Sequence, residues 1–263
     1  MTSMTWQGSR VGTQVWVLTL RSLRTAFGDY RLVFFGLLQP VVMLLLFSQV
    51  FQGIGGLPGV VEYRGYINFL VPATLVNVAL TTAMSSGVGL LAEVYTGFVG
   101  RLRTMPIALC SVLVARTLAD AVRLLVQLVV VVLAAVLLLG FRPAGLVGVS
   151  AAVLLCLVVG WGLGWLFVAI ATWQHKPETM HAVSFIVMFP LMFSSSAYMP
   201  LAAMPGWIRA VSTVNPVTYA IDATRALALG KPVGSALVIA VGLVAVAALL
   251  GAELAVRNFR RAR

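Results

Sequence analysis

Long apolar runs are the feature that most limits what this chain can fold into. Six of them are long enough to cross about 30 Å of hydrocarbon as a helix, which takes about 20 residues. The runs do not alternate apolar and polar residues, so they predict helices rather than the strands of a membrane barrel. The sequence therefore predicts an all-α integral membrane protein, one domain over 1–263, with six transmembrane helices. The predicted spans are residues 32–51, 66–91, 108–139, 145–171, 182–203 and 233–254.

The segment after the fifth run, residues 204–225, is still largely apolar but does not fit a further span. It contains two prolines and three charged side chains, which would leave unsatisfied backbone groups and desolvated ions in lipid. We therefore predict external re-entrant helices that enter the outer membrane boundary and turn back before the last span. The residues that break the run are Pro205, Gly206, Arg209, Asn215, Pro216, Asp222 and Arg225.

The composition fits a membrane protein and gives little support to other classes. Charged residues make up 10% of the chain and the mean hydropathy is +1.03, whereas about 25% of a soluble domain is charged. The net charge of +11 would suit nucleic acid, but the basic residues cluster at the ends of spans. We therefore expect contacts with membrane lipids and no nucleic-acid partner. Cys110 and Cys156 lie in or beside apolar runs, and two unpaired thiols are expected.

The distribution of Lys and Arg predicts the topology. One side of the membrane receives eleven of these residues and the other five, with Arg116 and Arg123 inside the third run. Cytoplasmic flanks carry the excess of positive charge, so both termini are expected in the cytoplasm. The eleven are Arg10, Arg21, Arg24, Arg31, Arg101, Arg103, Lys176, Arg257, Arg260, Arg261 and Arg263; the five are Arg64, Arg142, Arg209, Arg225 and Lys231.

Residues 1–31 have the pattern of an amphipathic helix. Apolar side chains recur at helical spacing on one side, and basic side chains gather on another. The apolar side has Trp16, Leu20, Leu23 and Phe27, and the basic side has Arg10, Arg21 and Arg24. This pattern predicts a cytoplasmic helix that lies in the headgroup plane. The alternative is a positive flank that only orients the first span.

The loop 93–106 is the only sizeable cytoplasmic connection predicted between spans. It reads EVYTGFVGRLRTMP, with Tyr95 and Phe98 on one side of a short amphipathic segment and two arginines behind them. A short cytoplasmic helix of this kind can dock into a groove on a soluble partner. The alternative is an ordinary basic loop.

Three charged residues near the start of the third run share one helical face. Arg116, Asp120 and Arg123 are spaced i, i+4 and i+7, so either arginine can neutralise the carboxylate. The residues that follow, 124–139, carry no charge and nearly span the membrane alone. We predict a structural ion pair at the cytoplasmic rim, with a transport site as the alternative.

The sequence contains none of the catalytic, metal-binding or nucleotide-binding motifs considered below. His175 and His181 fall on different helical faces, so no metal site is expected. Ser194, Ser195 and Ser196 have no nearby base and are expected to bond back to their own helix. All seven acidic residues lie at or near the ends of runs, which disfavours a proton-driven carrier. There is no phosphate loop, so any ATP that drives this protein must be hydrolysed by another polypeptide. We do not expect an enzyme.

The pattern of these segments resembles the membrane-spanning subunits of type-2 ABC exporters, in particular the daunorubicin-resistance-like permeases of drug and lipid exporters. The resemblance covers nearly the whole chain. Its most specific match is MPGWI at 204–208 followed by NPVTYAIDATR at 215–225, which in these permeases is the external re-entrant helix pair. The loop 93–106 resembles the coupling helix, although Gly100 stands where the family often has an acidic residue. The residues matched are Pro205, Gly206, Trp207, Asn215, Pro216, Tyr219, Asp222 and Arg225 in the re-entrant segment, and Glu93, Tyr95, Gly97, Phe98, Arg101, Arg103 and Pro106 in the coupling loop.

The resemblance implies a function and a set of partners. The chain would be the permease of an exporter in a bacterial plasma membrane, moving hydrophobic drugs or lipids outward. A cytoplasmic ABC ATPase would dock on the loop 93–106 and the N-terminal helix. That ATPase would carry ATP and Mg²⁺, and this chain would bind no cofactor itself. The resemblance also implies a second permease, identical or related, with the path between the two subunits lined by spans one, two and five.

Apolar side chains on spans one and five are the candidates for that path. Flexible methionines and flat aromatic rings accommodate varied hydrophobic ligands. The candidates are Met43, Phe47, Phe185, Met188, Phe189, Met192, Phe193 and Tyr198. The alternative for this stripe is helix packing in the dimer seam.

Two other functions compete with the drug or lipid exporter. A polysaccharide or teichoic-acid exporter would need more sugar-stacking aromatics, whereas the six Trp are dispersed, mostly near span ends as interface anchors. An ATP-independent secondary carrier is the contrasting class.

Overall fold

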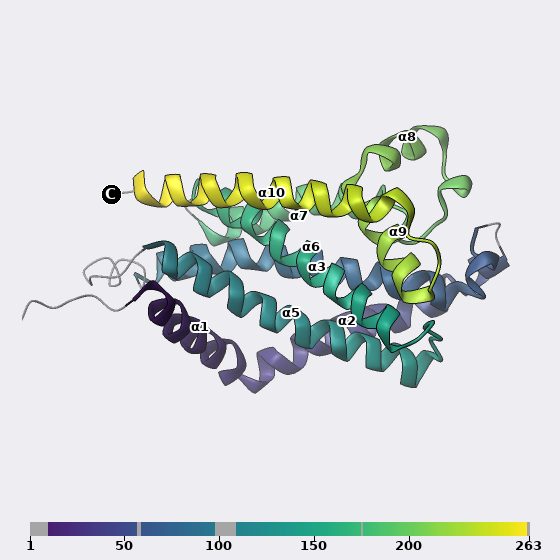
Figure 1. The fold of residues 1–263 in the computed structure, drawn as a ribbon, viewed down its shortest axis with the longest axis horizontal. Helices are drawn as coiled ribbons and strands as arrows, with labels where there is room; N and C mark the ends of the chain where they lie inside the picture. The colour runs from purple at the N-terminus through teal and green to yellow at the C-terminus, as the bar shows by residue number, and fades with distance from the viewer. Residues whose placement is uncertain (1–9, 57–58, 98–108, 175, 262–263) are drawn as a thin grey trace, which may run out of the picture.

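The computed structural model describes residues 10–56, 59–97, 109–174 and 176–261. In these ranges the chain forms α-helices and short 3₁₀ helices and no strand, and the long helices lie side by side along the longest axis of the molecule (Figure 1). The α-helices are α1 (Val11–Gly28), α2 (Tyr30–Val50), α3 (Tyr66–Tyr95), α5 (Leu109–Leu139), α6 (Leu146–Ala171), α7 (Pro177–Phe193), α8 (Gly206–Val214), α9 (Pro216–Leu229) and α10 (Gly234–Arg261), with 3₁₀ helices η1 (Gln52–Gly56), η2 (Val61–Tyr63) and η3 (Leu201–Ala203).

Five helices within the described ranges are long and apolar enough to cross a membrane by length and composition: α2, α3, α5, α6 and α10. They coincide with the first, second, third, fourth and sixth predicted spans. The main difference in their bounds is at α10, which continues to Arg261 instead of ending at 254. There the helix becomes charged, and Glu253 and Arg257 pair at 2.5 Å one turn apart. The predicted all-α membrane fold is confirmed.

The fifth predicted span, 182–203, has different bounds in the structure. α7 begins earlier, at Pro177, and ends at Phe193, so it has 17 residues, about 25 Å of helix. Pro177 suits a first helical position because its missing N–H would have no partner there. At the other end, a side chain replaces the backbone donor that the next turn of the helix would have supplied. Asn215 Nδ2 donates to the Leu191 carbonyl at 2.6 Å.

α3 is the centre of the bundle, and α6 is its main neighbour. Buried residues make up 78% of the span window of α3 but only 11% of that of α2. Glycines allow the close approach: a Cβ on Gly87 of α3 would lie 2.5 Å from the Phe167 carbonyl oxygen of α6. On α6, a Cβ on Gly160 would lie 3.1 Å from the Ala79 carbonyl oxygen of α3. Backbone packs directly on backbone at these crossings.

α1 packs on α5 through polar contacts. Thr19 Oγ1 donates to the Ala115 carbonyl at 3.3 Å, and Ser111 Oγ donates to Gln14 Oε1 at 3.2 Å. Trp16 is 70% exposed, so the apolar side of the helix is free to meet lipid. The amphipathic pattern of residues 1–31 predicts this helix, and its place in the headgroup plane stays a prediction; residues 1–9 lie outside the described part of the chain.

Two short helices follow α7 at one end of the molecule, where the sequence predicts re-entrant helices (Figure 1). Pro205 and Gly206 begin α8, and Pro216 begins α9. Trp207 on α8 is 73% exposed, and the Tyr219 hydroxyl of α9 donates to the Thr213 carbonyl at 2.6 Å. The beginning of α1 and the end of α10 lie at the opposite end of the bundle.

Candidate functional site

Five aromatic side chains form a row, here called the aromatic ladder, along α7 and the adjoining end of α2. Phe185, Phe189 and Phe193 follow one another at one-turn spacing, with centroids 5.5 and 4.3 Å apart. Tyr198, in the turn after α7, lies 5.6 Å from Phe193 and 4.9 Å from Phe47 of α2. The structure thus brings together five of the eight residues predicted to line a path.

Most of the ladder lies on the outer surface of the bundle. Phe185, Phe189 and Phe193 are each about half exposed, and Met43 on α2 is also exposed. Met188 differs from the expectation: it is 8% exposed and packs in the core, and Met192 is partly buried against the same core. Each methionine directly precedes a ladder phenylalanine in the sequence, so its side chain points about 100° around the helix from that ring, toward the inner side of α7.

The row of aromatic rings continues beyond the predicted residues. Phe51 lies 6.4 Å from Tyr198 and 6.3 Å from Tyr66 at the start of α3, and Tyr66 lies 6.2 Å from Phe69. None of these three was predicted. For Phe51 a signal was present, because it follows Phe47 by four residues and so shares its helical face.

Asn215 fixes the turn that carries Tyr198. Its Nδ2 donates to the Leu191 carbonyl at 2.6 Å and to Ser194 Oγ at 3.1 Å, both at the end of α7. Its Oδ1 accepts from the Val217 N–H at 2.9 Å, which caps the beginning of α9. One side chain therefore ends one helix and starts another.

Arg225 joins α9 to α3 and to the same turn. Only 2% exposed, it donates to Asp222 at 3.0 Å, to the Ser196 carbonyl at 3.0 Å and to the Phe69 carbonyl at 3.2 Å. Its guanidinium also lies 3.8 Å from the centroid of the Phe69 ring. Ser196 Oγ donates to Asp222 at 2.8 Å, so the buried cation is paired and its carboxylate is held in place. The ion and its hydrogen bonds fix the end of the ladder that carries Tyr198.

A second polar group, here called the inner charged cluster, joins α3 and α5 and consists of Glu93, Arg116, Asp120 and Arg123. Arg116 pairs with Glu93 at 2.7 Å and lies 3.9 Å from Asp120, which is 3.7 Å from Arg123. Ser86 Oγ donates to Asp120 at 2.6 Å. The spacing predicted the Asp120 contacts, but Glu93 is on another helix and was not expected to join them.

The inner charged cluster borders a cavity of about 620 Å³ between the α1–α2 bend and the helices α3 and α5. Apolar side chains of α1 and α2, including Phe27, Val33 and Leu37, line its other side. Gly89 makes room for the arginine, because a Cβ there would collide with the guanidinium of Arg116. The cavity therefore combines a charged wall with an apolar one.

The predicted coupling loop lies largely outside the described residues. Glu93 and Tyr95 occupy the last turn of α3, and Gly97 follows with a φ of 71°, in the left-handed region. Four of the seven predicted contact residues fall in the part that the structure does not describe, namely Phe98, Arg101, Arg103 and Pro106.

The described side chains offer no cluster of three or more His, Cys, Asp or Glu that could hold a metal ion. Cys110 and Cys156 are both unpaired.

Comparison with known families decides the class of this protein. A family model described as ABC-2 type transporter matches residues 13–229, from within α1 to the end of α9. The chain belongs to the ABC-2 type transporter family. The family predicted from the motifs is thereby confirmed, and the chain is a multi-pass membrane protein of the permease type.

Several known proteins are similar to this chain over most of its length. The daunorubicin resistance ABC transporter permease protein DrrB1 of Streptomyces coeruleorubidus is 33% identical over 218 residues, 81% of this chain and 75% of that protein. The probable doxorubicin resistance ABC transporter permease protein DrrC of Mycobacterium tuberculosis is 28% identical, with 86% and 80% covered. The putative transport permease ycf38 of Cyanophora paradoxa is 31% identical, with 73% and 66% covered.

Proposed function

We propose that this chain is the transmembrane subunit of an ATP-driven exporter that moves hydrophobic drugs or lipids out of a bacterial cytoplasm or inner leaflet. The observation that carries the proposal is the exposed aromatic ladder in a member of the ABC-2 family. Two relatives have names that refer to daunorubicin or doxorubicin resistance, which makes aromatic drugs the first substrates to test.

The ladder suits a path for flat apolar molecules. Its rings present faces and edges that stack on an aromatic ligand, and the same faces attract a cationic amine. The ladder itself contains no charged residue, so a hydrophobic ligand that binds there does not have to desolvate an ion. In the proposed dimer, with an identical or related permease, the ladders of both subunits face a shared path.

The inner charged cluster supports a route by which an ATPase drives the permease. Glu93 lies at the end of α3 where the loop 93–106 begins, and its 2.7 Å ion pair with Arg116 ties that end to α5. A separate cytoplasmic ABC ATPase, which binds ATP and Mg²⁺, would push on the loop. That movement would reach the bundle through α3 and α5. Both termini lie on the ATPase side in this proposal.

Reconstitution tests the transport function directly. The chain and its partner ATPase in proteoliposomes are expected to move daunorubicin only when ATP is present. Phe189→Ala with Phe193→Ala should lower the transport rate about tenfold and leave basal ATPase activity unchanged. Phe35→Ala is the control, because Phe35 is exposed on α2 but is not part of the ladder. Transport by the chain alone under a proton gradient would instead indicate a secondary carrier.

A second experiment tests the coupling loop. Phe98→Ala with Arg101→Glu removes an aromatic side chain and reverses a charge in the loop 93–106. The ATPase is expected to be lost on co-purification while the bundle keeps its thermal stability. Retained co-purification with unchanged transport would contradict the docking role.

A further inference from the structure

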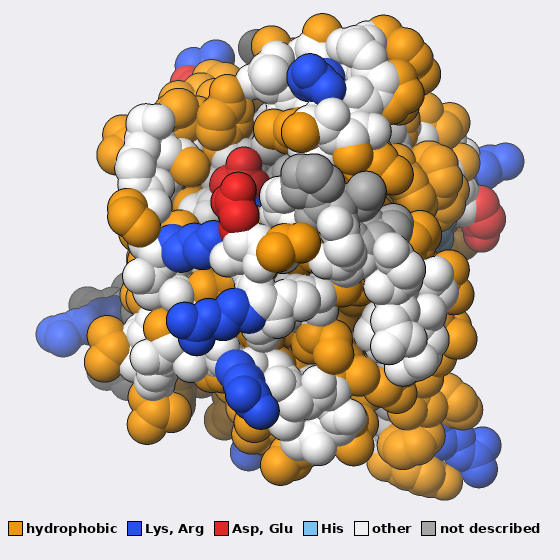
Figure 2. All heavy atoms as spheres, turned by 90° about the vertical axis from the view of Figure 1, so that its right-hand side faces the viewer, with side chains coloured by type: hydrophobic (Ala, Val, Ile, Leu, Met, Phe, Trp, Pro, Cys, Tyr) orange, Lys and Arg blue, Asp and Glu red, His pale blue; other side chains and the backbone are white. Residues whose placement is uncertain are grey.

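The end of the molecule that carries α8 and α9 contains a cavity of about 910 Å³ that is lined by both polar and apolar residues. Figure 2 shows this end, where Lys and Arg side chains gather with acidic side chains beside them. Three cations line the cavity, and each comes from a different connection: Arg64 precedes α3, Arg142 joins α5 to α6, and Lys231 joins α9 to α10. We call this cavity the outer basic pocket.

The positive charge of the outer basic pocket is not balanced by its surroundings. Of the described residues that line the pocket, Glu62 alone is acidic. Among the described residues, no carboxylate lies within salt-bridge distance of Arg64, Arg142 or Lys231. Lys231 instead rests on an aromatic face, with its Nζ 3.6 Å from the centroid of the Tyr63 ring. The pocket therefore has three cations against one acid and keeps a net attraction for anions.

The connections that carry the cations are tied to one another. Asn68 Nδ2 donates to the Tyr63 carbonyl at 3.0 Å beside Arg64, and Asn68 Oδ1 accepts from the Arg142 N–H at 3.2 Å. The Ala144 N–H donates to the Ala228 carbonyl at 3.0 Å, which joins the loop of Arg142 to the end of α9. The cations are thus held around one space before any ligand arrives, which lowers the entropic cost of binding.

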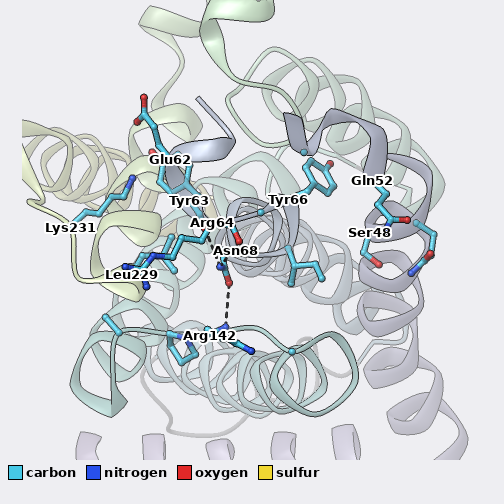
Figure 3. A pocket seen from close by; sticks show the side chains of 17 residues that line it. Ser48, Gln52, Glu62, Tyr63, Arg64, Tyr66, Asn68, Arg142, Leu229 and Lys231 are labelled. Atoms are coloured by element: carbon cyan, nitrogen blue, oxygen red, sulfur yellow. Dashed lines mark hydrogen bonds between the residues drawn. The ribbon is translucent and has the colours of Figure 1, made fainter. Parts of the chain in front are cut away.

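Arg64 itself has an unusual backbone. Its φ of 58° lies in the left-handed region, and within the described ranges no other non-glycine residue has a positive φ. Residues without a short polar side chain rarely adopt this conformation. It orients a long cationic side chain beside the cavity, where Figure 3 shows Arg64 and Lys231 on one side, Ser48 and Gln52 on the other and Arg142 below.

We propose that the outer basic pocket binds a phosphate group, supplied by the headgroup of an anionic lipid in the outer leaflet or by a soluble phosphate ester. Two arginines and a lysine match phosphate oxygens, and Ser48, Gln52 and Asn68 offer further polar groups around them. Ser48 belongs to α2, and only 11% of the span window of α2 is buried inside the bundle. A lipid can therefore place its acyl chains along the exposed surface of α2 and its headgroup in the pocket. Only the choice of leaflet rests on the orientation in the proposed function.

A photoactivatable phosphatidylglycerol in nanodiscs tests the site without any transport assay. Labelled peptides are expected around Arg64, Arg142 and Lys231, and unlabelled phosphatidylglycerol should compete, whereas phosphatidylcholine should not. Arg64→Asn, Arg142→Gln and Lys231→Gln combined should lower the affinity about 100-fold, and each alone about fivefold. Asn suits position 64 because it tolerates a positive φ. Glu62→Gln should raise the affinity.

A matched triple variant separates the pocket from net charge. Arg10→Gln, Arg24→Gln and Arg257→Gln remove the same charge at the opposite end and should leave labelling of the pocket unchanged. Glycerol 1-phosphate tests the source of the phosphate, because competition at equal concentration would assign a soluble ester and weak competition a lipid. The proposal is overturned if the pocket triple variant labels as the wild type does, if phosphatidylcholine labels equally, or if the matched triple loses the same labelling. An ATPase that fails to associate would affect only the proposed function.

Discussion

At the scale of single residues, the end of this permease that carries α8 and α9 depends on side chains that serve two elements at once. Asn215 ends α7 and begins α9, and Arg225 joins α9 to the carbonyls of Phe69 and Ser196. These contacts join segments that lie far apart along the chain. Each substitution at such a position affects two elements.

Two substitutions at Asn215 separate its two roles. Asn215→Ala removes the cap of α9 and the donor to the Leu191 carbonyl, and it should lower the free energy of unfolding by about 2–3 kcal/mol. Asn215→Asp keeps the acceptor for the Val217 N–H but loses the donor, so about half of that loss is expected. Thermal unfolding in detergent measures both. If the two variants lowered the free energy of unfolding equally, the Asn215 cap of α9 would contribute nothing to stability.

The residue-scale contacts were only partly predictable from the sequence. Arg116, Asp120 and Arg123 lie on one helix, so their spacing indicated the contacts that the structure contains. The serine segment was harder to predict. Ser195 bonds back to Met192 of its own helix as expected, but Ser196 donates to Asp222 of α9. Which distant segment packs on a serine depends on tertiary structure, and periodicity carries no information about it.

At the scale of helices, the apolar runs predicted the helix bounds closely wherever the thickness of the hydrocarbon core alone sets the length of the helix. The exception is α7, whose end at Phe193 is set by hydrogen bonds to α9. An apolar run of the right length therefore predicts that a segment is buried in the membrane but not how much of it is helical. The same limit explains why Met188 was placed on the path, since hydrophobicity does not distinguish the two sides of α7.

The contact between α3 and α6 gives a prediction at this scale. Gly87→Ala would place a Cβ 2.5 Å from the Phe167 carbonyl oxygen, and the backbones must move apart. We expect a loss of about 1–3 kcal/mol in the free energy of unfolding, measured in detergent. Gly242→Ala is the control, because a Cβ there has no heavy atom within 4 Å; it should be neutral or stabilising. If both variants lose the same stability, close packing at Gly87 is not important.

At the scale of the whole molecule, two polar regions lie at opposite ends of an apolar bundle. One end has α8, α9 and the outer basic pocket, and the other end has the inner charged cluster and the end of α10 (Figure 1). The aromatic ladder runs along α7 toward the end that carries α8 and α9. This layout suits a permease that receives force at one end and releases its substrate at the other.

The excess of Lys and Arg on one side predicts the orientation of this layout, and accessibility labelling tests it. In a Cys110→Ala, Cys156→Ala background, a membrane-impermeant maleimide should label Trp207→Cys in intact cells, because that position lies on exposed α8. Arg257→Cys, near the end of α10, should be labelled only after lysis. The two positions lie at opposite ends of the bundle, so labelling of both from outside would place α8 and the end of α10 in the same compartment. That result would exclude the re-entrant arrangement of α8 and α9, because an odd number of crossings cannot connect two positions on one side.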